Sequence, residues 1–288
     1  MRNGRLSDNA GEIAAGDRFA FGRNWRDFLD RLNEERILGA TASLEGLLGK
    51  GGLRGKRMVD VGSGSGLFSL AAMRLGAGEV RSFDFDPSSV ECARILKGRY
   101  FPGDDRWSIG EGSVLDPAFL STLGRYDVVY SWGVLHHTGD LWRAIDNIRS
   151  LVSPEGRIAL AIYNDQGWKS SAWRRIKKLY CRTPGMLRPV LFLPIPLYFE
   201  GKWMAADLVH GKVPFASWRR QSDRGMSPYH DWIDWLGGYP FEVARPQEVV
   251  DFFRRHGFAA EKLVACGDGW ANNEFVFRAP SGAGAAND

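Results

Sequence analysis

The sequence has few cysteines, no long apolar run and little net charge. Its 288 residues include three cysteines, Cys92, Cys181 and Cys266, which form no close pair and no metal-ligand spacing. This pattern excludes a fold held together by disulfides, and a reducing cytoplasmic setting is the simplest account. No run reaches about 18 apolar residues and the N-terminus lacks an apolar signal core, so we expect neither a membrane span nor secretion.

Charge and apolar content are those of an ordinary globular chain. A net charge of +4 and a pI near 9.0 are too small a basic excess to predict nucleic-acid binding without a localised patch. A hydrophobic fraction of 44% with 12% aromatic residues supports a large core. The length fits one large α/β domain with an elaboration, or two small domains.

A strand, a glycine-rich loop and a helix are predicted around residue 62. The apolar run Met58–Val61 contains Asp60, and Gly62, Gly64 and Gly66 follow at every second position. Glycines here let the backbone approach a ligand closely, with the first amides of the helix turned toward it. The apolar residues after the loop repeat with helical spacing: Leu67, Leu70, Ala71 and Leu75.

A second carboxylate, Asp84, ends the next apolar run and stands 22 positions after Gly62. In a βαβ unit this spacing places the carboxylate beside a ribose bound over the glycine loop, which predicts an adenosine-type cofactor. Nicotinamide sites favour Gly-x-Gly-x-x-Gly after an apolar residue, whereas the carboxylate of Asp60 suits a cation or an ammonium group. Two alternatives to this cofactor remain: a nicotinamide or flavin site, and a glycine turn that only joins the strand to the helix.

The pattern Asp-x-Gly-x-Gly-x-Gly resembles the first motif of class I S-adenosylmethionine-dependent methyltransferases, and Asp84 matches that family's ribose-binding acid. The resemblance implies that Asp60 and the glycine loop, Ser63 included, bind the methionine part of S-adenosyl-L-methionine. It also implies that backbone amides of Ser113 and Val114 hold the adenine. The family often has an acidic side chain where this chain has Ser113.

Strand and helix patterns alternate from residue 53 to 163, which predicts an α/β fold whose parallel sheet is covered by helices on both faces. A helix at 245–256 and strand-like runs at 259–265 and 273–278 complete the Rossmann-like seven-stranded, mostly parallel sheet that the resemblance implies. The strands expected before them are Arg57–Val61, Val80–Phe83, Trp107–Ile109, Tyr126–Ser131 and Arg157–Tyr163.

The rest of the chain is expected to elaborate this core. The insertion after the fifth strand holds six of the eleven tryptophans and many basic residues, and long irregular insertions usually serve as lids or binding loops. The expected units are a disordered tail (1–16), an N-terminal helical cover over the cofactor (17–52), the methyltransferase core (53–164 and 241–279), an aromatic and basic lid insertion (165–240) and a loose tail (280–288).

Two adjacent histidines, His136 and His137, follow the fourth strand. In the resembling family this strand end, which includes Ser131, faces the sulfonium and the acceptor, and a histidine suits a general base for a hydroxyl acceptor. Adjacent side chains in an extended segment point opposite ways, so we expect one histidine to face the pocket and the other to pack or to bond to the backbone. The sequence does not choose between them.

Further acceptor contacts are expected from the cover, from the end of the fifth strand and from the insertion. For each of these segments a purely structural role is the alternative to acceptor binding, because its residues also suit packing in the core, the start of a loop or the core of a lid. No metal site is predicted, since two ligands at helical spacing without a third do not make one. The candidate acceptor-binding residues are Trp25, Tyr163, Asn164, His230, Asp231 and Asp234.

A basic and aromatic run at 168–182 precedes an apolar run at 190–199. The two runs together could contact a membrane surface or bind an acidic sugar or a phosphate-bearing carrier. They could also form a helix with a solvated basic face beside an apolar loop that packs on the domain. The sequence leaves these three interpretations open.

We interpret the chain as a cytoplasmic methyltransferase that acts on a hydroxyl of a small molecule or glycan. Methylation of RNA is the alternative among enzymes, but the segment Ser131–Val134 lacks the Asn/Asp-Pro-Pro-Tyr/Phe motif of amino-methylating enzymes, which disfavours a nucleic-acid partner. A non-catalytic cofactor-binding subunit is the alternative outside enzymes. The oligomeric state stays open.

Overall fold

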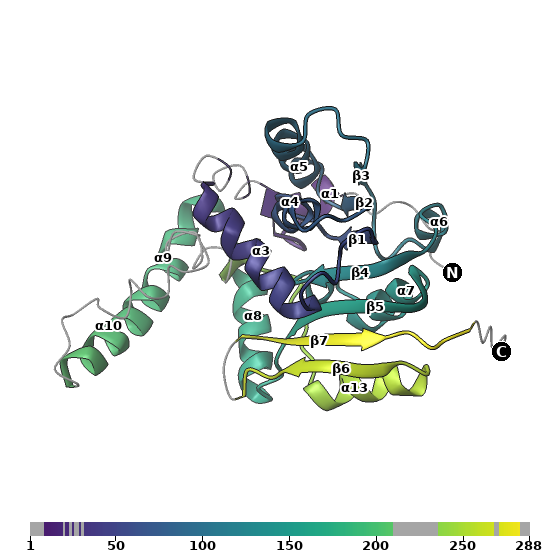
Figure 1. The fold of residues 1–288 in the computed structure, drawn as a ribbon. Helices are drawn as coiled ribbons and strands as arrows, with labels where there is room; N and C mark the ends of the chain where they lie inside the picture. The colour runs from purple at the N-terminus through teal and green to yellow at the C-terminus, as the bar shows by residue number, and fades with distance from the viewer. Residues whose placement is uncertain are drawn as a thin grey trace.

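The computed structural model describes residues 9–19, 21–22, 25, 29, 32–209, 236–267 and 271–282. A seven-stranded sheet with the order β3-β2-β1-β4-β5-β7-β6 forms its centre (Figure 1). Strand β7 runs antiparallel to its neighbours β5 and β6, and the other neighbouring strands are parallel. The strands are β1 (Arg57–Val61), β2 (Glu79–Asp84), β3 (Trp107–Glu111), β4 (Tyr126–Trp132), β5 (Val152–Tyr163), β6 (Ala259–Val264) and β7 (Asn272–Arg278).

Helices cover both faces of this sheet, and each face has its own apolar core. On one face, Ile37, Leu70 and Leu96 of three different helices pack against the sheet. On the other face, Ile145 and Phe253 belong to a second buried cluster. The helices of the first face are α3 (Glu34–Leu48), α4 (Leu67–Arg74) and α5 (Pro87–Tyr100), and those of the second are α6 (Pro117–Ser121), α7 (Leu141–Arg149) and α13 (Pro246–Arg255).

Three helices begin at an aspartate that accepts hydrogen bonds from their first free amides. Asp86 caps α5 and Asp140 caps α7. Asp116 caps α6, with its Oδ1 atom 3.0 Å from the amide nitrogen of Ala118. These caps fix the helix starts just past the carboxyl ends of the strands, where a parallel sheet of this kind binds ligands.

Strand β5 is longer than the sequence pattern predicts. It begins at Val152, which pairs with Tyr126 before an irregularity in the β4–β5 register. The apolar pattern expected from Arg157 onward missed this part because Pro154 and Gly156 interrupt it.

The N-terminal part differs from the expectation in two respects. Residues expected to belong to a disordered tail form helix α1 (Asn9–Ala14). Helix α3 does not fold over the cofactor loop, because its buried residues Ile37 and Leu44 join the core under α4. The stretch before α3 contacts the C-terminal part of the chain, where the amide of Phe19 donates to the carbonyl of Tyr239 at 2.9 Å.

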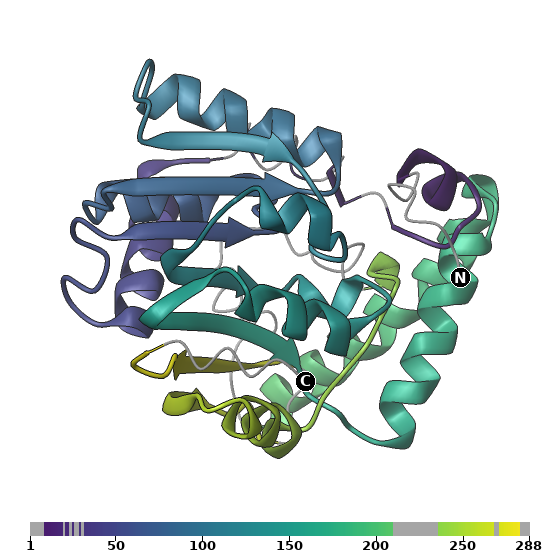
Figure 2. The ribbon, with the colours of Figure 1, turned by 90° about the vertical axis from the view of Figure 1, so that its right-hand side faces the viewer.

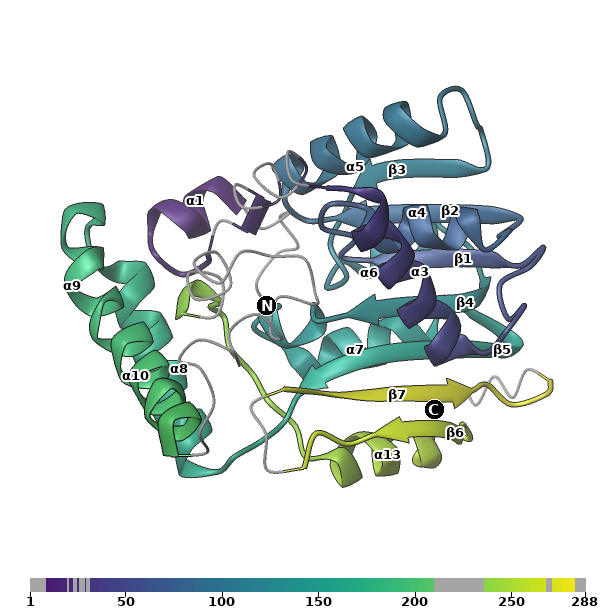
Figure 3. The same ribbon diagram turned by 60° about the vertical axis from the view of Figure 1, so that its left-hand side comes forward.

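The insertion after β5 begins with helix α8 (Trp168–Arg182), a short 3₁₀ turn (Gly185–Leu187), α9 (Arg188–Phe192) and α10 (Pro194–Val209). These helices lie beyond the sheet edge at which β5 ends, next to α1 (Figures 2 and 3). The run at 190–199, for which an apolar loop packed on the domain is one of the three interpretations, lies in α9 and α10, and its Leu197 is 70% exposed. No helix in the described ranges has the length and apolar character needed to cross a membrane.

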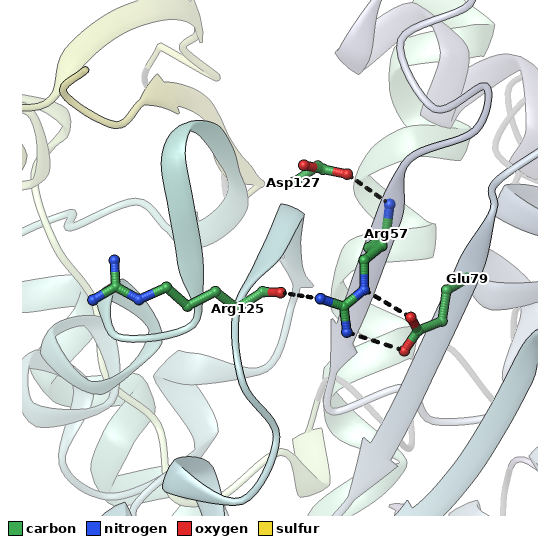
Figure 4. A network of polar contacts seen from close by, with 4 residues as sticks. All are labelled: Arg57, Glu79, Arg125 and Asp127. Carbon is green, nitrogen blue, oxygen red and sulfur yellow. Dashed lines mark hydrogen bonds and ion pairs between the residues drawn. The ribbon is translucent and has the colours of Figure 1, made fainter. Parts of the chain in front are cut away.

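The opposite edge of the sheet carries a polar network (Figure 4). Asp127 accepts a hydrogen bond from the amide of Arg57 at 2.9 Å, and the Arg57 guanidinium bonds to the Arg125 carbonyl and to Glu79. These bonds join the starts of β1, β2 and β4. Since the ion pair is exposed, it contributes about 0–1 kcal/mol to the free energy of unfolding.

Candidate active site

The glycine loop between β1 and α4 folds as a tight bend. Gly62, Gly64 and Gly66 have φ values of +72°, +53° and +81°, which glycine adopts without strain. A Cβ atom on Gly62 would lie 2.2 Å from Cγ1 of Val134, and one on Gly64 would lie 3.0 Å from Cε2 of Trp25. The loop is therefore closely approached by the β4 loop on one side and by the N-terminal stretch on the other.

The carboxylate of Asp60 lies beneath this loop. It is 3% exposed and accepts a hydrogen bond from the Ser69 hydroxyl at 2.6 Å. Burial, with a smaller effect of the nearby Asp84 carboxylate, raises the pKa of Asp60 to about 7, although the hydrogen bond from Ser69 lowers it. A buried carboxylate with this pKa is stabilised in its ionised form by a cation.

Asp84 holds the bend from the end of β2. Its carboxylate accepts from the amide of Gly64 at 2.9 Å and from the amide of Asp86 at 2.8 Å. Burial raises the pKa of Asp84 to about 6, although these two bonds lower it. The residue keeps a partly exposed surface at the loop, which leaves it open to hydroxyl donors such as those of a ribose.

The loop residues fit a cationic adenosine cofactor. Within the described parts of the chain, neither Asp60 nor Asp84 has an ion-pair partner, and the buried hydroxyl of Ser63 has no hydrogen-bond partner. S-adenosylmethionine carries a sulfonium and an ammonium, which suit the neighbouring carboxylates of Asp60 and Asp84, and ribose hydroxyls, which suit Asp84.

The other predicted cofactor residues lie around the same edge. The hydroxyl of Ser113 accepts from the amide of Leu115 at 3.2 Å, and Val114 is 7% exposed. Ser131 is fully buried and donates its hydroxyl to the carbonyl of Val61 at 3.1 Å. This bond ties β4 to the end of β1, so the Ser131 side chain supports the loop from beneath.

The two histidines do not point in opposite directions, and that expectation is wrong. Leu135–His137 form a 3₁₀ turn rather than an extended segment, so the alternation expected of a strand does not apply to the two rings. Their ring centres are 4.5 Å apart, and both rings contact Tyr163, at 4.0 Å for His136 and 5.5 Å for His137. The β4 loop and the end of β5 therefore present one cluster of three rings.

Hydrogen bonds assign different tautomers to the two rings. The amide of Tyr163 donates to Nδ1 of His136 at 3.3 Å, so a neutral His136 carries its proton on Nε2. Nδ1 of His137 lies 2.7 Å from the carbonyl oxygen of Pro240, which only accepts, so a neutral His137 carries its proton on Nδ1. Burial lowers the pKa of His136 far below its usual value and that of His137 to about 3, so both are neutral near pH 7.

The predicted acceptor residues divide into three groups. Trp25 lies against the glycine loop and Tyr163 in the histidine cluster. Asn164 is engaged by its surroundings, since its side chain donates to Gly267 and accepts from Asn273. His230, Asp231 and Asp234 lie outside the described residues. Among the described residues, no group of three or more His, Cys, Asp or Glu side chains is placed to hold a metal ion.

Sequence reasoning missed three contributors to the cluster. Lys177 of α8 is 1% exposed and places its Nζ atom 4.9 Å from the centre of the Phe241 ring. Phe241 in turn contacts Tyr163 at 5.4 Å between ring centres, and Arg18 donates to the carbonyl of His137 at 3.2 Å. Helical spacing held a signal for Lys177, which lies three and four positions before the buried Tyr180 and Cys181.

Comparison with known proteins agrees with this geometry. Residues 22–259 match a family described as methyltransferase domain. The chain belongs to this methyltransferase family. It is a class I, Rossmann-like enzyme fold whose cofactor is S-adenosylmethionine.

The similar solved structures given below share little sequence identity with this methyltransferase, and the similar curated protein matches only part of its chain. Magnesium protoporphyrin IX methyltransferase from Synechocystis, with bound S-adenosylmethionine, superposes with a TM-score of 0.55 and 11% identity over 96% of this chain and 100% of that one. An O-methyltransferase family protein from Burkholderia thailandensis gives 0.50 and 16% over 97% and 63%. Ribosomal protein L11 methyltransferase from Bacillus cereus is 44% identical over 62 residues, 22% of this chain and 20% of that protein. The chain thus matches about a fifth of that relative.

Proposed function

We propose that this methyltransferase methylates a hydroxyl oxygen of a small molecule or glycan, with His137 as the general base. When bound, S-adenosylmethionine supplies a methyl group on a positively charged sulfur. The residues of the chain then need to bind the acceptor, align its oxygen with that methyl group and accept the hydroxyl proton.

The single observation that carries this proposal is the pair of opposite tautomers. Nε2 of His137 has a free lone pair in the neutral ring because Nδ1–H donates to Pro240. Nε2–H of His136 is a donor, and this buried atom has no hydrogen-bond partner among the described residues. A hydroxyl suits such a pair, because its oxygen accepts from one ring while its proton is given to the other.

Both histidine rings of the pair are neutral near pH 7. Burial, with the nearby charges of Lys177 and Arg18, keeps His137 neutral, so its lone pair is available near pH 7, and the same factors make the ring a weaker base than a free imidazole. Asp60 and the glycine loop would hold the methionine part of the cofactor, Asp84 the ribose, and Ser113 and Val114 the adenine. The Burkholderia protein, which is described as an O-methyltransferase, supports transfer to oxygen.

The experiment is a labelling assay with methyl-labelled S-adenosylmethionine and a cell extract, followed by a mutational comparison. We expect the label in a soluble metabolite or a glycan. His137→Gln should then lower kcat about 100-fold or more, as for a lost general base, while cofactor affinity measured by calorimetry stays the same. His256→Gln is the matched control, because His256 is an exposed histidine at the end of α13.

Three results would contradict the proposal, each in a different way. Label in RNA would contradict the proposed small-molecule or glycan acceptor. An unchanged kcat in His137→Gln would show that His137 is not the general base. Tight cofactor binding without transfer to any fraction would favour a non-catalytic cofactor-binding subunit.

A further inference from the structure

Helices α9 and α10 carry an exposed stripe of apolar side chains. The amide of Leu193 donates to the carbonyl of Pro189 at 2.9 Å, and the amide of Leu197 donates to the carbonyl of Leu193 at 3.3 Å, so the helical path continues from α9 into α10. Five aliphatic residues recur along this path at spacings of three, four, seven and four positions, which places them on one face. This apolar stripe consists of Val190, Leu193, Leu197, Met204 and Leu208, and each of its side chains is between 37% and 70% exposed.

The apolar stripe differs from the apolar faces of the helices that cover the sheet. On α7, for example, Leu141, Ile145 and Ile148 are buried in the core. A single exposed leucine is ordinary on a protein surface, but a continuous apolar stripe marks a surface that binds something. From Val190 to Leu208 the stripe is about 27 Å long at 1.5 Å per residue, and Figure 1 shows α10 leading away from the sheet. The stripe is therefore not part of the layer that covers the domain core.

The basic charge of the chain is concentrated in the same segment. Residues 166–209 contain eight Lys and Arg and two Asp and Glu, whereas the whole chain has a net charge of only +4. The rest of the chain is therefore slightly acidic. Lys169 and Arg175 of α8 are exposed, and Arg182 is exposed as well but pairs with Asp17 at 2.8 Å. The segment thus combines the apolar stripe with a local excess of positive charge.

An anionic lipid surface complements both features. Its phosphate groups attract Lys and Arg, and the acyl chains beneath them accept aliphatic side chains. A second copy of this chain would bring the same positive charge to the contact, which disfavours a dimer through the stripe. RNA would match the charge, but its bases stack on aromatic rings, and the stripe consists of aliphatic side chains.

We propose that α9 and α10 bind the surface of an anionic lipid bilayer. The apolar stripe enters the boundary between headgroups and acyl chains, and Lys169 and Arg175 add electrostatic attraction to the lipid phosphates. Because α8, α9 and α10 lie beyond the sheet edge that carries the candidate active site (Figure 3), the docked protein holds that site near the membrane. The inference goes beyond the proposed function and does not depend on the nature of the acceptor.

Cosedimentation of the full chain with lipid vesicles tests the contact directly. Vesicles made of equal parts of phosphatidylglycerol and phosphatidylcholine should bind the protein about tenfold more tightly than vesicles of phosphatidylcholine alone, since each basic residue near a charged surface adds to the attraction. Raising the salt concentration should weaken the binding to the anionic vesicles, because salt screens these charges. Equal binding to both kinds of vesicle, or binding to neither, would overturn the inference.

Two variants test the apolar and the basic part of the surface separately. Leu197→Gln keeps a residue that suits a helix but removes an apolar side chain that would leave water on docking, so it should weaken vesicle binding about tenfold. Lys169→Glu should weaken binding to the anionic vesicles as well. Leu38→Gln on α3 and Lys56→Glu are the matched controls, because both residues are exposed and lie outside the segment, and they should leave the binding unchanged. An unchanged vesicle affinity in Leu197→Gln would overturn the inference.

Further measurements separate the membrane from other occupants of the stripe and from the active site. Without lipid, the wild-type protein and Leu197→Gln should sediment alike, and a dimer that this variant dissociates would overturn the inference in favour of a second copy. RNA binding that Leu197→Gln weakens would overturn it in favour of RNA. The affinity for S-adenosylhomocysteine should be equal in both proteins, which shows that the variant is folded. Absence of methyl transfer by a protein that binds anionic vesicles would overturn the proposed function and leave this inference standing.

Discussion

Cofactor binding should depend on pH through the carboxyl of Asp84, whose pKa burial raises to about 6. Ribose hydroxyls donate to the ionised carboxylate, so protonation of Asp84 competes with binding. The contribution of Asp84 to the affinity should therefore rise with pH up to about 7 and then level off. Below pH 6 this contribution should fall about tenfold per pH unit, so that protonation of Asp84 alone weakens binding at pH 5 by about 1.4 kcal/mol relative to its value above pH 7.

Isothermal titration calorimetry between pH 5 and 8 measures this dependence directly. Asp84→Asn should remove the step near pH 6, and Asp84→Ala should weaken binding by about 1–3 kcal/mol, as for a lost charge-assisted hydrogen bond. Asp127→Asn is the matched control, because Asp127 lies at the opposite edge of the sheet and an asparagine keeps the oxygen that accepts from Arg57.

Two further comparisons identify the cause of the step. S-adenosylhomocysteine lacks the sulfonium charge but keeps the ribose, so the step that belongs to Asp84 should persist with it. Asp60, with a pKa of about 7, adds a second step at higher pH, which Asp60→Asn removes. Affinity that is independent of pH, or that increases on acidification, would refute the assignment of Asp84 to the ribose.

Two other predictions concern packing. Gly62→Ala should destabilise the protein by about 1–3 kcal/mol and weaken cofactor binding, because its Cβ would overlap Val134 and its φ is +72°; a Tm within 1 °C of the wild type would contradict this. Phe253→Ala should cost about 3–5 kcal/mol in urea unfolding, because its ring is fully buried and stacks on Phe277 at 4.1 Å; a loss below about 1 kcal/mol would show that the α13 face is not tightly packed.

Local patterns were sufficient to predict most of the sheet. Strand β1 has the predicted bounds, and β2, β3, β4, β6 and β7 agree within two residues at each end, because apolar runs ending at glycine or aspartate mark such strands well. The glycine bend and the position of Asp84 followed from the same rules. Strand β5 was cut short because Pro154 and Gly156 lie inside it.

Contacts between distant segments could not be predicted in this way. The orientation of His136 and His137 depends on a 3₁₀ turn and on the Pro240 carbonyl, which is far away in the sequence. The buried Lys177 of α8 contacts the ring of Phe241, which is also far away in the sequence. Neither contact leaves a periodic trace in the chain, and only the spacing from Lys177 to Tyr180 hinted at a buried lysine.

A crystal structure with S-adenosylhomocysteine would test the central claim most directly. We predict the adenosine over the loop from Gly62 to Gly66, with both ribose hydroxyls within hydrogen-bond distance of Asp84 and the homocysteine sulfur facing His136 and His137. A ligand bound elsewhere, or ribose hydroxyls out of reach of Asp84, would contradict it.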